Sequence, residues 1–142
     1  MFNFLMNSYL SKRNLLGFIV SSIFCFNLVL AQCDMPTNSV HLTGDGDVWY
    51  NVDTDIGGFQ FNVDGTTVAG ASGGDAAANG FTVSAGGSTV LAFSFTGGTI
   101  PAGCGTLVSL TLNGDATGLS GIVFSDPSGS AFDVTYYEGG GD

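Results

Sequence analysis

Between Val40 and Tyr136 the chain is a succession of short runs rich in β-branched and aromatic residues, and glycine-containing turn signals separate most of them. Short runs bounded by such turns are typical of all-β domains. Only the three alanines at 76–78 favour a single helical turn. The sequence therefore predicts a jelly-roll-like β-sandwich of about eight or nine short antiparallel strands, preceded by an N-terminal signal helix. The expected strands are residues 40–42, 48–52, 59–63, 66–68, 81–83, 90–95, 106–112, 119–124 and 132–137.

The run 59–63 (FQFNV) alternates apolar and polar residues with a period of two. That period describes a strand with one buried and one solvent-facing side. We therefore expect Phe59 and Phe61 to point into the core. Gln60 and Asn62 should point toward solvent or a partner.

A turn signal follows this strand directly. Asp64-Gly65 separates it from the next β-type run, which begins at Thr66. An Asp-Gly pair between two such runs favours a type I′ turn, because both central residues of that turn need a positive φ. We expect the two runs to form a hairpin.

Residues 1–31 have the pattern of a secretory signal peptide. Lys12 and Arg13 precede an apolar run at 15–31 (LLGFIVSSIFCFNLVLA), which ends in a small residue. The run is shorter than the roughly 20 apolar residues of a membrane-spanning helix, so we favour cleavage after Ala31 and a secreted, extracellular protein. Cys33 just beyond the run resembles the lipid-attachment motif of bacterial lipoproteins, which makes a lipid anchor at Cys33 the lesser alternative.

Charge after position 31 is entirely negative. Lys12 and Arg13 are the only basic residues, so a chain cleaved after Ala31 retains twelve acidic residues and has a formal charge of 0 − 12 = −12. Such a surface does not attract phosphates, which excludes nucleic acid and anionic membrane surfaces as partners. Its content of Phe, Val, Leu and Thr is nevertheless sufficient for a core. We expect one domain at 32–138, followed by a flexible glycine-rich tail at 139–142.

Cysteine use agrees with export. Cys25 lies in the expected signal peptide, which leaves Cys33 and Cys104 as a pair. In an oxidising compartment the two should form a disulfide that ties the start of the domain to the loop before a later strand.

Catalytic motifs are lacking. His41 is the only histidine, no Gly-x-Ser-x-Gly motif occurs, and a phosphate-binding Gly-rich loop is absent. A lone histidine near a first strand is more often a surface or capping residue. We expect a protein that is not an enzyme and that has no catalytic residues.

Calcium is the one metal whose preferred oxygen ligands the chain offers in quantity. The candidate ligands flank the run 48–52 in two pairs and are Asp45, Asp47, Asp53 and Asp55. Aspartates of this kind also serve simply as turn residues, which is the simpler interpretation. No other cofactor is expected.

Exposed aromatic rings are the other candidate contacts, because sugars stack on them. Strand alternation predicts that one residue of each neighbouring aromatic pair faces outward. Together with the outward-facing polar residues of run 59–63, the candidate ligand-binding residues are Trp49, Tyr50, Gln60, Asn62 and Tyr137.

The segment 46–63 (GDVWYNVDTDIGGFQFNV) resembles the beginning of a cohesin-type module, with a strand, a short acidic connection and an I-x-G-F-Q-F strand. Residues 100–112 (IPAGCGTLVSLTL) resemble that family's glycine turn and following strand, and 118–132 (GLSGIVFSDPSGSAF) fits its last strands. Cohesins are jelly-roll β-sandwiches that hold dockerin modules, and related sandwiches bind carbohydrate. Similar glycine-rich domains occur in secreted and phage structural proteins of marine origin.

These observations together predict a secreted, non-enzymatic binding or adhesion module with a protein or polysaccharide ligand. The alternative is a structural subunit of an extracellular fibre, sheath or virion that self-associates through strand edges.

Overall fold

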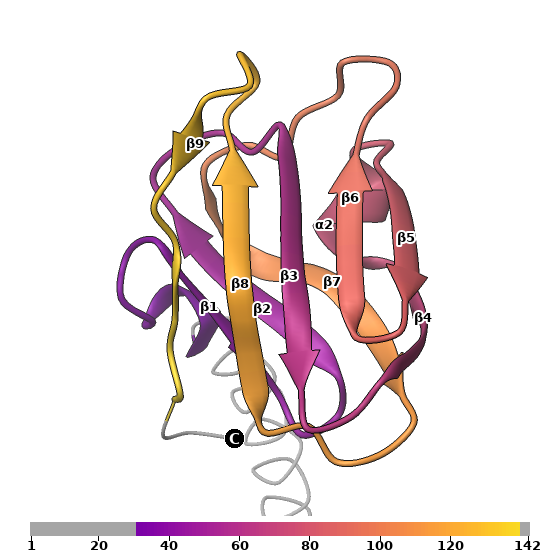
Figure 1. Cartoon of the computed structure of the whole chain (residues 1–142). Helices are drawn as coiled ribbons and strands as arrows, with labels where there is room; N and C mark the ends of the chain where they lie inside the picture. Colours follow the sequence, from indigo (N-terminus) through magenta and orange to yellow (C-terminus); the bar gives the residue numbers. More distant parts are fainter. Residues whose placement is uncertain (1–30, 140–142) are drawn as a thin grey trace, which may run out of the picture. The chain divides into compact units, whose positions relative to one another are not determined.

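Ten strands form two five-stranded sheets in the computed structural model, which describes residues 31–139 (Figure 1). The first sheet has the strand order β10-β1-β2-β7-β4, and the second sheet has the order β5-β6-β3-β8-β9. The elements are β1 (Ser39–Leu42), β2 (Asp47–Val52), β3 (Gly58–Asp64), β4 (Val68–Ser72), α2 (Gly74–Ala78), β5 (Thr82–Gly86), β6 (Thr89–Phe93), β7 (Gly103–Leu112), β8 (Gly118–Ser125), β9 (Ala131–Phe132) and β10 (Thr135–Tyr136).

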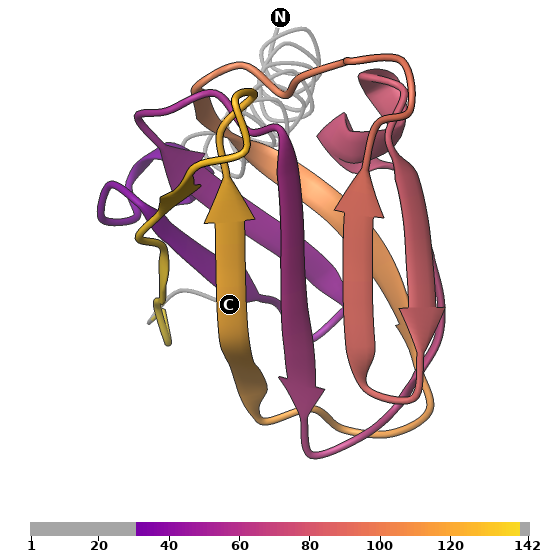
Figure 2. The ribbon, with the colours of Figure 1, turned by 45° about the horizontal axis from the view of Figure 1, so that its top comes forward.

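The two sheets face each other across one apolar core, which confirms the predicted β-sandwich (Figures 1 and 2). All strand pairs are antiparallel except β1 and β10, which are parallel. The expected last strand, 132–137, is instead divided into β9 and β10, and Tyr137 follows β10. β9 belongs to the second sheet and β10 to the first, and Val134 between them is buried. The predicted helical turn is present as α2, which contacts both β7 and β5.

β3 occupies the middle of the second sheet, between β6 and β8. Its alternation gives the predicted orientation, since Phe59 and Phe61 are buried whereas Gln60 is exposed. The ring of Phe59 lies 5.6 to 6.3 Å from the rings of Phe61, Phe81 and Phe124. This stack of aromatic rings forms the centre of the core against the second sheet.

The predicted hairpin at Asp64-Gly65 is wrong. β3 pairs with β6 and β8, whereas β4 pairs with β7 in the first sheet. Both edges of β3 are thus occupied by other strands. The turn, with Gly65 at φ 92°, instead carries the chain from one sheet to the other.

Two register irregularities explain buried positions that simple alternation does not predict. In β8 the register shifts opposite β3, so that Leu119 and Phe124 both reach the core. Gly121 lies at this shift with φ 58°, and a Cβ there would lie 2.8 Å from the amide nitrogen of Asn62. A similar shift between β2 and β7 allows Leu107 and Val108 to be buried side by side.

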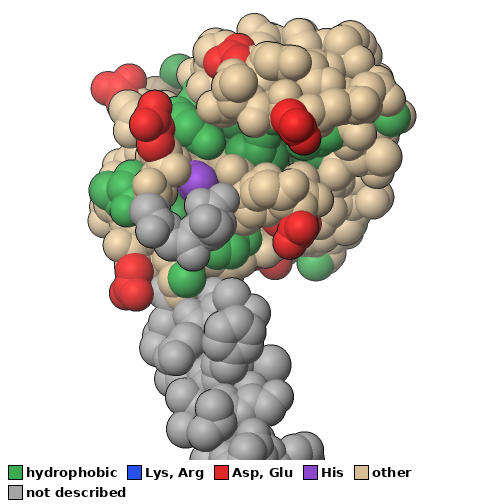
Figure 3. All heavy atoms as spheres, turned by 90° about the horizontal axis from the view of Figure 1, so that it is seen from below, with side chains coloured by type: hydrophobic (Ala, Val, Ile, Leu, Met, Phe, Trp, Pro, Cys, Tyr) green, Lys and Arg blue, Asp and Glu red, His purple; other side chains and the backbone are tan. Residues whose placement is uncertain are grey.

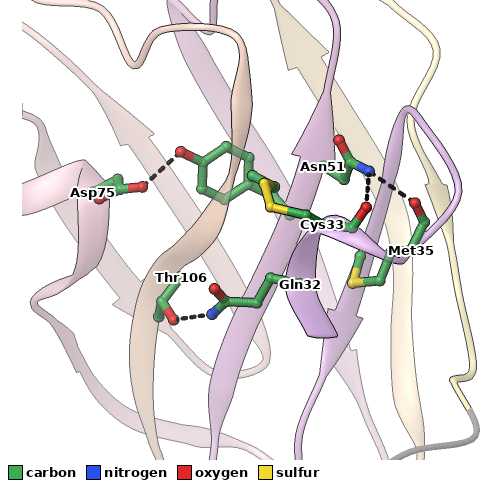
Figure 4. The surroundings of a disulfide bond; sticks show 8 residues. Gln32, Cys33, Met35, Asn51, Asp75 and Thr106 are labelled. Atoms are coloured by element: carbon green, nitrogen blue, oxygen red, sulfur yellow. Dashed lines mark hydrogen bonds between the residues drawn. A yellow bond between two sulfur atoms is a disulfide. The ribbon is translucent and has the colours of Figure 1, made fainter. Parts of the chain in front are cut away.

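The predicted disulfide between Cys33 and Cys104 is present, with the two Cα atoms 5.2 Å apart (Figure 4). Cys104 lies within β7 and not in the loop before it. The same region is held by Gln32, which donates to the Thr106 hydroxyl, and by Asn51, which donates to the carbonyls of Cys33 and Met35. These bonds attach the segment before β1 to the first sheet.

The predicted signal peptide lies outside the described residues except for Ala31, and the predicted tail does so except for Gly139. Among residues 31–139, no helix has the length and hydropathy that a membrane crossing requires.

Candidate binding surface

The outward side of the second sheet has an apolar patch around the middle of β3. Gln60 of β3 pairs with Leu91 of β6 on one side and with Val123 of β8 on the other. Leu91 is 40% exposed and Val123 is 52% exposed, so two aliphatic side chains flank one amide on an open face. We call these three residues the outer patch.

The patch lines one end of a shallow hollow that extends two residues further along β3, from Gln60 to Gly58. Gly58 forms its floor between Phe93 of β6 and Ser125 of β8, and the hollow has a volume of about 220 Å³. Phe95, just past the end of β6, is 78% exposed, and its ring contacts the ring of Phe93 edge-on at 4.7 Å. The surface therefore joins an aliphatic patch to a pair of aromatic rings.

Charged groups border this surface only at its ends. Asp64 is the last residue of β3 and accepts a hydrogen bond from the Ser120 hydroxyl. Asp126 follows β8 and accepts from the Ser128 hydroxyl and from the backbone N–H groups of Ser128 and Ser130. The hydrogen bond from the Ser128 side chain, followed by the bonds from the backbone, lowers the pKa of Asp126. The middle of the surface is uncharged.

The five predicted ligand-binding residues do not form one site. Gln60 and Asn62 are on the outer side of the second sheet, as expected. Trp49 is half-buried in β2 and Tyr137 follows β10, so both belong to the first sheet. Tyr50 points into the core and is 3% exposed.

Trp49 and Tyr137 instead lie next to His41. Their ring centroids are 5.8 and 6.2 Å from that of His41, and Tyr136 stacks on the same imidazole at 6.0 Å. His41 is 4% exposed, which differs from the surface or capping position expected for it. The physical reason is the segment after β10: the Tyr137 carbonyl lies 2.8 Å from His41 Nδ1, and Gly139 lies against the ring.

The four aspartates considered as calcium ligands remain in two pairs at opposite ends of β2. A strand of this length spans about 20 Å, which separates Asp45 and Asp47 from Asp53 and Asp55. Within residues 31–139 no group of three or more His, Cys, Asp or Glu side chains is arranged to hold a metal ion.

Three of these four carboxylates accept hydrogen bonds within the fold. Asp47 accepts from the Ser109 hydroxyl, Asp53 accepts from the Thr54 hydroxyl, and Asp55 accepts from the backbone N–H of Ala102. Such bonds are those of aspartates that fix turns and strand ends.

The carboxylate of Asp75, which is half-buried, holds a core tyrosine in place. Tyr50 donates a hydrogen bond to Asp75 Oδ2 across the space between β2 and α2 (Figure 4). Burial, and next the hydrogen bond and negative charge of Asp75, raise the pKa of Tyr50 far above its ordinary value of 10.0. Tyr50 is thus a structural residue and not a ligand platform.

No pattern in the sequence marked Leu91, Val123 or Phe95 as binding residues. Run 90–95 places Leu91 and Phe93 on one face and Val90 and Ala92 on the other, and the face with Leu91 and Phe93 is the outer one. The reason is steric, because Phe59 lies directly opposite Ala92 in the pairing of β3 with β6. A small residue faces the core there since large aromatic rings already fill it.

A scan of protein-family models and a search of curated proteins gave no match for this chain.

Proposed function

We propose that this protein is a secreted, non-enzymatic binding module that holds a protein partner on the outer patch and the neighbouring hollow. The observation that carries the proposal is the pair of exposed aliphatic side chains, Leu91 and Val123, on either side of Gln60. Open apolar patches of this kind, when bordered by polar groups, commonly mark protein–protein contact sites.

A protein partner is favoured over a polysaccharide by the chemistry of the surface. Sugar sites depend on exposed rings that present a flat face, and the aromatic residues predicted for that role are divided between the core and the first sheet. The outer patch is mainly aliphatic, with one amide for a hydrogen bond. Phe95 at its margin offers a ring that a partner's apolar side chain can cover.

Two further observations support the proposal. The resemblance of segment 46–63 to cohesin-type modules implies a β-sandwich that binds another protein module, and β3 of that segment forms the centre of the patch. The disulfide between Cys33 and Cys104 is compatible with an extracellular protein.

The test compares proteins captured from the culture medium and cell surface of the source organism. Wild-type chain should retain a partner that the double variant Leu91→Asp and Val123→Asp loses, because a charge placed in the patch must be desolvated on binding. Thr111→Asp is the control for a single added carboxylate, since it places one at an exposed position of β7 in the first sheet, and it is compared with Leu91→Asp and Val123→Asp made singly as well as together.

A partner retained equally by the wild type and the double variant would contradict the proposal. So would glycan-array binding that the double variant leaves unchanged, because it would indicate a carbohydrate ligand elsewhere on the domain. Circular dichroism must first show that all of these chains are equally folded.

A further inference from the structure

A cavity lies at the end of the sandwich where β8 begins, which is the lower end in Figure 1. Its volume is about 350 Å³, a size that small-molecule sites commonly have. The wall comes from the end of β1, the connection between β7 and β8, β10 and the residues after β10. Figure 3 views this end of the domain, where His41 (purple) is visible among hydrophobic side chains and acidic side chains lie on several sides of it. We call this hollow the end cavity.

An aromatic ring forms part of the wall of the end cavity. Tyr136 stacks on the buried imidazole of His41, with the ring centroids 6.0 Å apart and the ring planes at 27°. The same ring lies against Gly118, where a Cβ would come within 3.2 Å of one of its carbon atoms. A larger residue at position 118 would therefore displace the ring. His41 and Gly118 together fix the place of Tyr136 in the wall.

The two carboxylates of the wall are not neutralised by a Lys or Arg of the domain. Asp115 belongs to the connection between β7 and β8, Glu138 follows β10, and both side chains are exposed. Residues 31–139 contain eleven acidic residues and neither Lys nor Arg. Within this part of the chain, neither carboxylate accepts a hydrogen bond from another residue, whereas those of Asp64 and Asp126 accept bonds from serine hydroxyls.

The rest of the wall offers aliphatic and hydroxyl-bearing side chains. Leu112 and Ala116 are half-buried there, and Thr43 and Thr117 are the threonines that line the cavity. A hard cation such as Ca²⁺ needs six to eight oxygen ligands and gains nothing from aliphatic or aromatic groups. An organic cation gains from all of them, because its hydrocarbon part contacts the aliphatic side chains while its charge lies near carboxylates and an aromatic ring.

We propose that the end cavity binds a small organic cation, namely an ammonium or guanidinium group on a short aliphatic chain. Asp115 and Glu138 hold the charged group, the ring of Tyr136 contacts it through a cation–π interaction, and Leu112 contacts the chain. The negative charge of the whole domain raises the local concentration of such cations. A free amine and a Lys or Arg side chain of a partner protein both have this chemistry. The site is separate from the outer patch, which lies in the middle of β3, β6 and β8.

The test is an NMR titration of protein expressed from the complete 142-residue sequence, at an ionic strength of about 0.1 M, where the Debye length is about 10 Å. The probes are agmatine, a free amine with a guanidinium group, and N-acetyl-arginine amide, which represents a side chain within a protein. N-acetyl-citrulline amide is the neutral control, because it has nearly the same shape as the arginine probe. We expect amide signals of residues 115–118 and 136–138 to shift, with dissociation constants on the order of 1 mM for the cationic probes.

The two cationic probes distinguish the sources of the ligand. Agmatine that binds about tenfold or more tightly than N-acetyl-arginine amide would indicate a free amine, since the blocked backbone of the second probe is then an obstacle. Equal or tighter binding of N-acetyl-arginine amide would indicate a side chain of a partner. Either result supports a site for an organic cation.

Isosteric substitutions assign the binding to the end cavity. Glu138→Gln and Asp115→Asn should each weaken agmatine binding by about threefold, the usual effect of one exposed ion pair. Asp53→Asn is the matched control, because it removes the same charge from an exposed position just after β2, at the opposite end of that strand from the turn that follows β1. It should change the dissociation constant by less than about 1.5-fold at this ionic strength.

Three results would overturn the proposal. The first is an absence of shifts at these amides with agmatine at up to about 20 mM. The second is equal binding of the arginine and citrulline probes, since the site would then not recognise charge. The third is equal weakening by Asp53→Asn and by Glu138→Gln, which would show general attraction of cations to an acidic domain and not a site.

Discussion

The phenol of Tyr50 donates a hydrogen bond of 2.6 Å to the carboxylate of Asp75. Tyr50 comes from β2 and Asp75 from the first turn of α2, so the bond ties the helix to the first sheet. Gly105, the β7 residue that pairs with Tyr50, leaves room for it: a Cβ at Gly105 would lie 2.8 Å from Asp75 Oδ2. Because no Lys or Arg follows position 31, this carboxylate relies on a hydroxyl donor.

Replacing Tyr50 with Phe should lower the free energy of unfolding by about 2 kcal/mol, the usual contribution of a hydrogen bond to a charged group. Asp75→Asn should lower the free energy of unfolding by less, because the amide oxygen can still accept the hydrogen bond from Tyr50. Denaturant unfolding at neutral pH measures both. An unchanged midpoint in Tyr50→Phe would show that the bond contributes nothing to stability.

Gly105→Ala tests the same contact from the opposite side. The added methyl group must displace the Asp75 carboxylate, so the variant should lose the hydrogen bond although both partners remain. In a double-mutant cycle, Gly105→Ala should lower the free energy of unfolding by less in the Tyr50→Phe background than in the wild type. Strictly additive losses would contradict this explanation.

The raised pKa of Tyr50 predicts a stability change at high pH. The folded state holds the phenol proton more tightly than the unfolded state does, so this stabilisation is complete below the unfolded pKa near 10.0. It is lost as the pH rises from there through the higher pKa of the folded state. Unfolding free energy measured above pH 10 should fall more steeply in the wild type than in Tyr50→Phe. Equal slopes would contradict the assignment.

The sequence was sufficient to predict the two-sheet architecture, the inward and outward sides of β3, and the disulfide. Each of these depends on local alternation or on the small number of cysteines. Topology was harder, as Asp64-Gly65 shows. Its turn chemistry suits a hairpin, but β6 and β8 occupy both edges of β3, and they come from much later in the chain.

The outer patch could not be predicted for a related reason. Alternation identifies two faces of run 90–95 but does not say which is buried when one has Val90 and Ala92 and the other has Leu91 and Phe93. Only the rings of Phe59 and Phe61 on the neighbouring strand decide it. His41 is similar, since its burial depends on the segment that follows β10.

The disulfide should contribute strongly to stability in a domain that lacks basic residues after position 31. Cys33 and Cys104 are 71 positions apart, and closing a loop of that length is worth about 4 kcal/mol in the chain-entropy model. The variant with both cysteines replaced by Ala should unfold at correspondingly lower denaturant concentration. Wild type treated with reductant should match it, and reductant should not affect the double variant.

Salt should stabilise this protein. In most proteins salt weakens ion pairs as well as repulsions, but residues 31–139 hold eleven acidic residues and no Lys or Arg, so screening acts mainly on repulsion. We expect the melting temperature to rise on the order of 5 °C between about 0.01 and 0.5 M NaCl, which corresponds to roughly 1 kcal/mol. Replacing the exposed Asp45 and Asp133 with Asn should reduce this rise. A melting temperature that falls with NaCl would mean that self-repulsion does not limit the stability of the fold.

Calcium chloride at matched ionic strength should raise the melting temperature no more than NaCl does. A larger rise in calcium chloride would show that the aspartates beside β2 bind calcium.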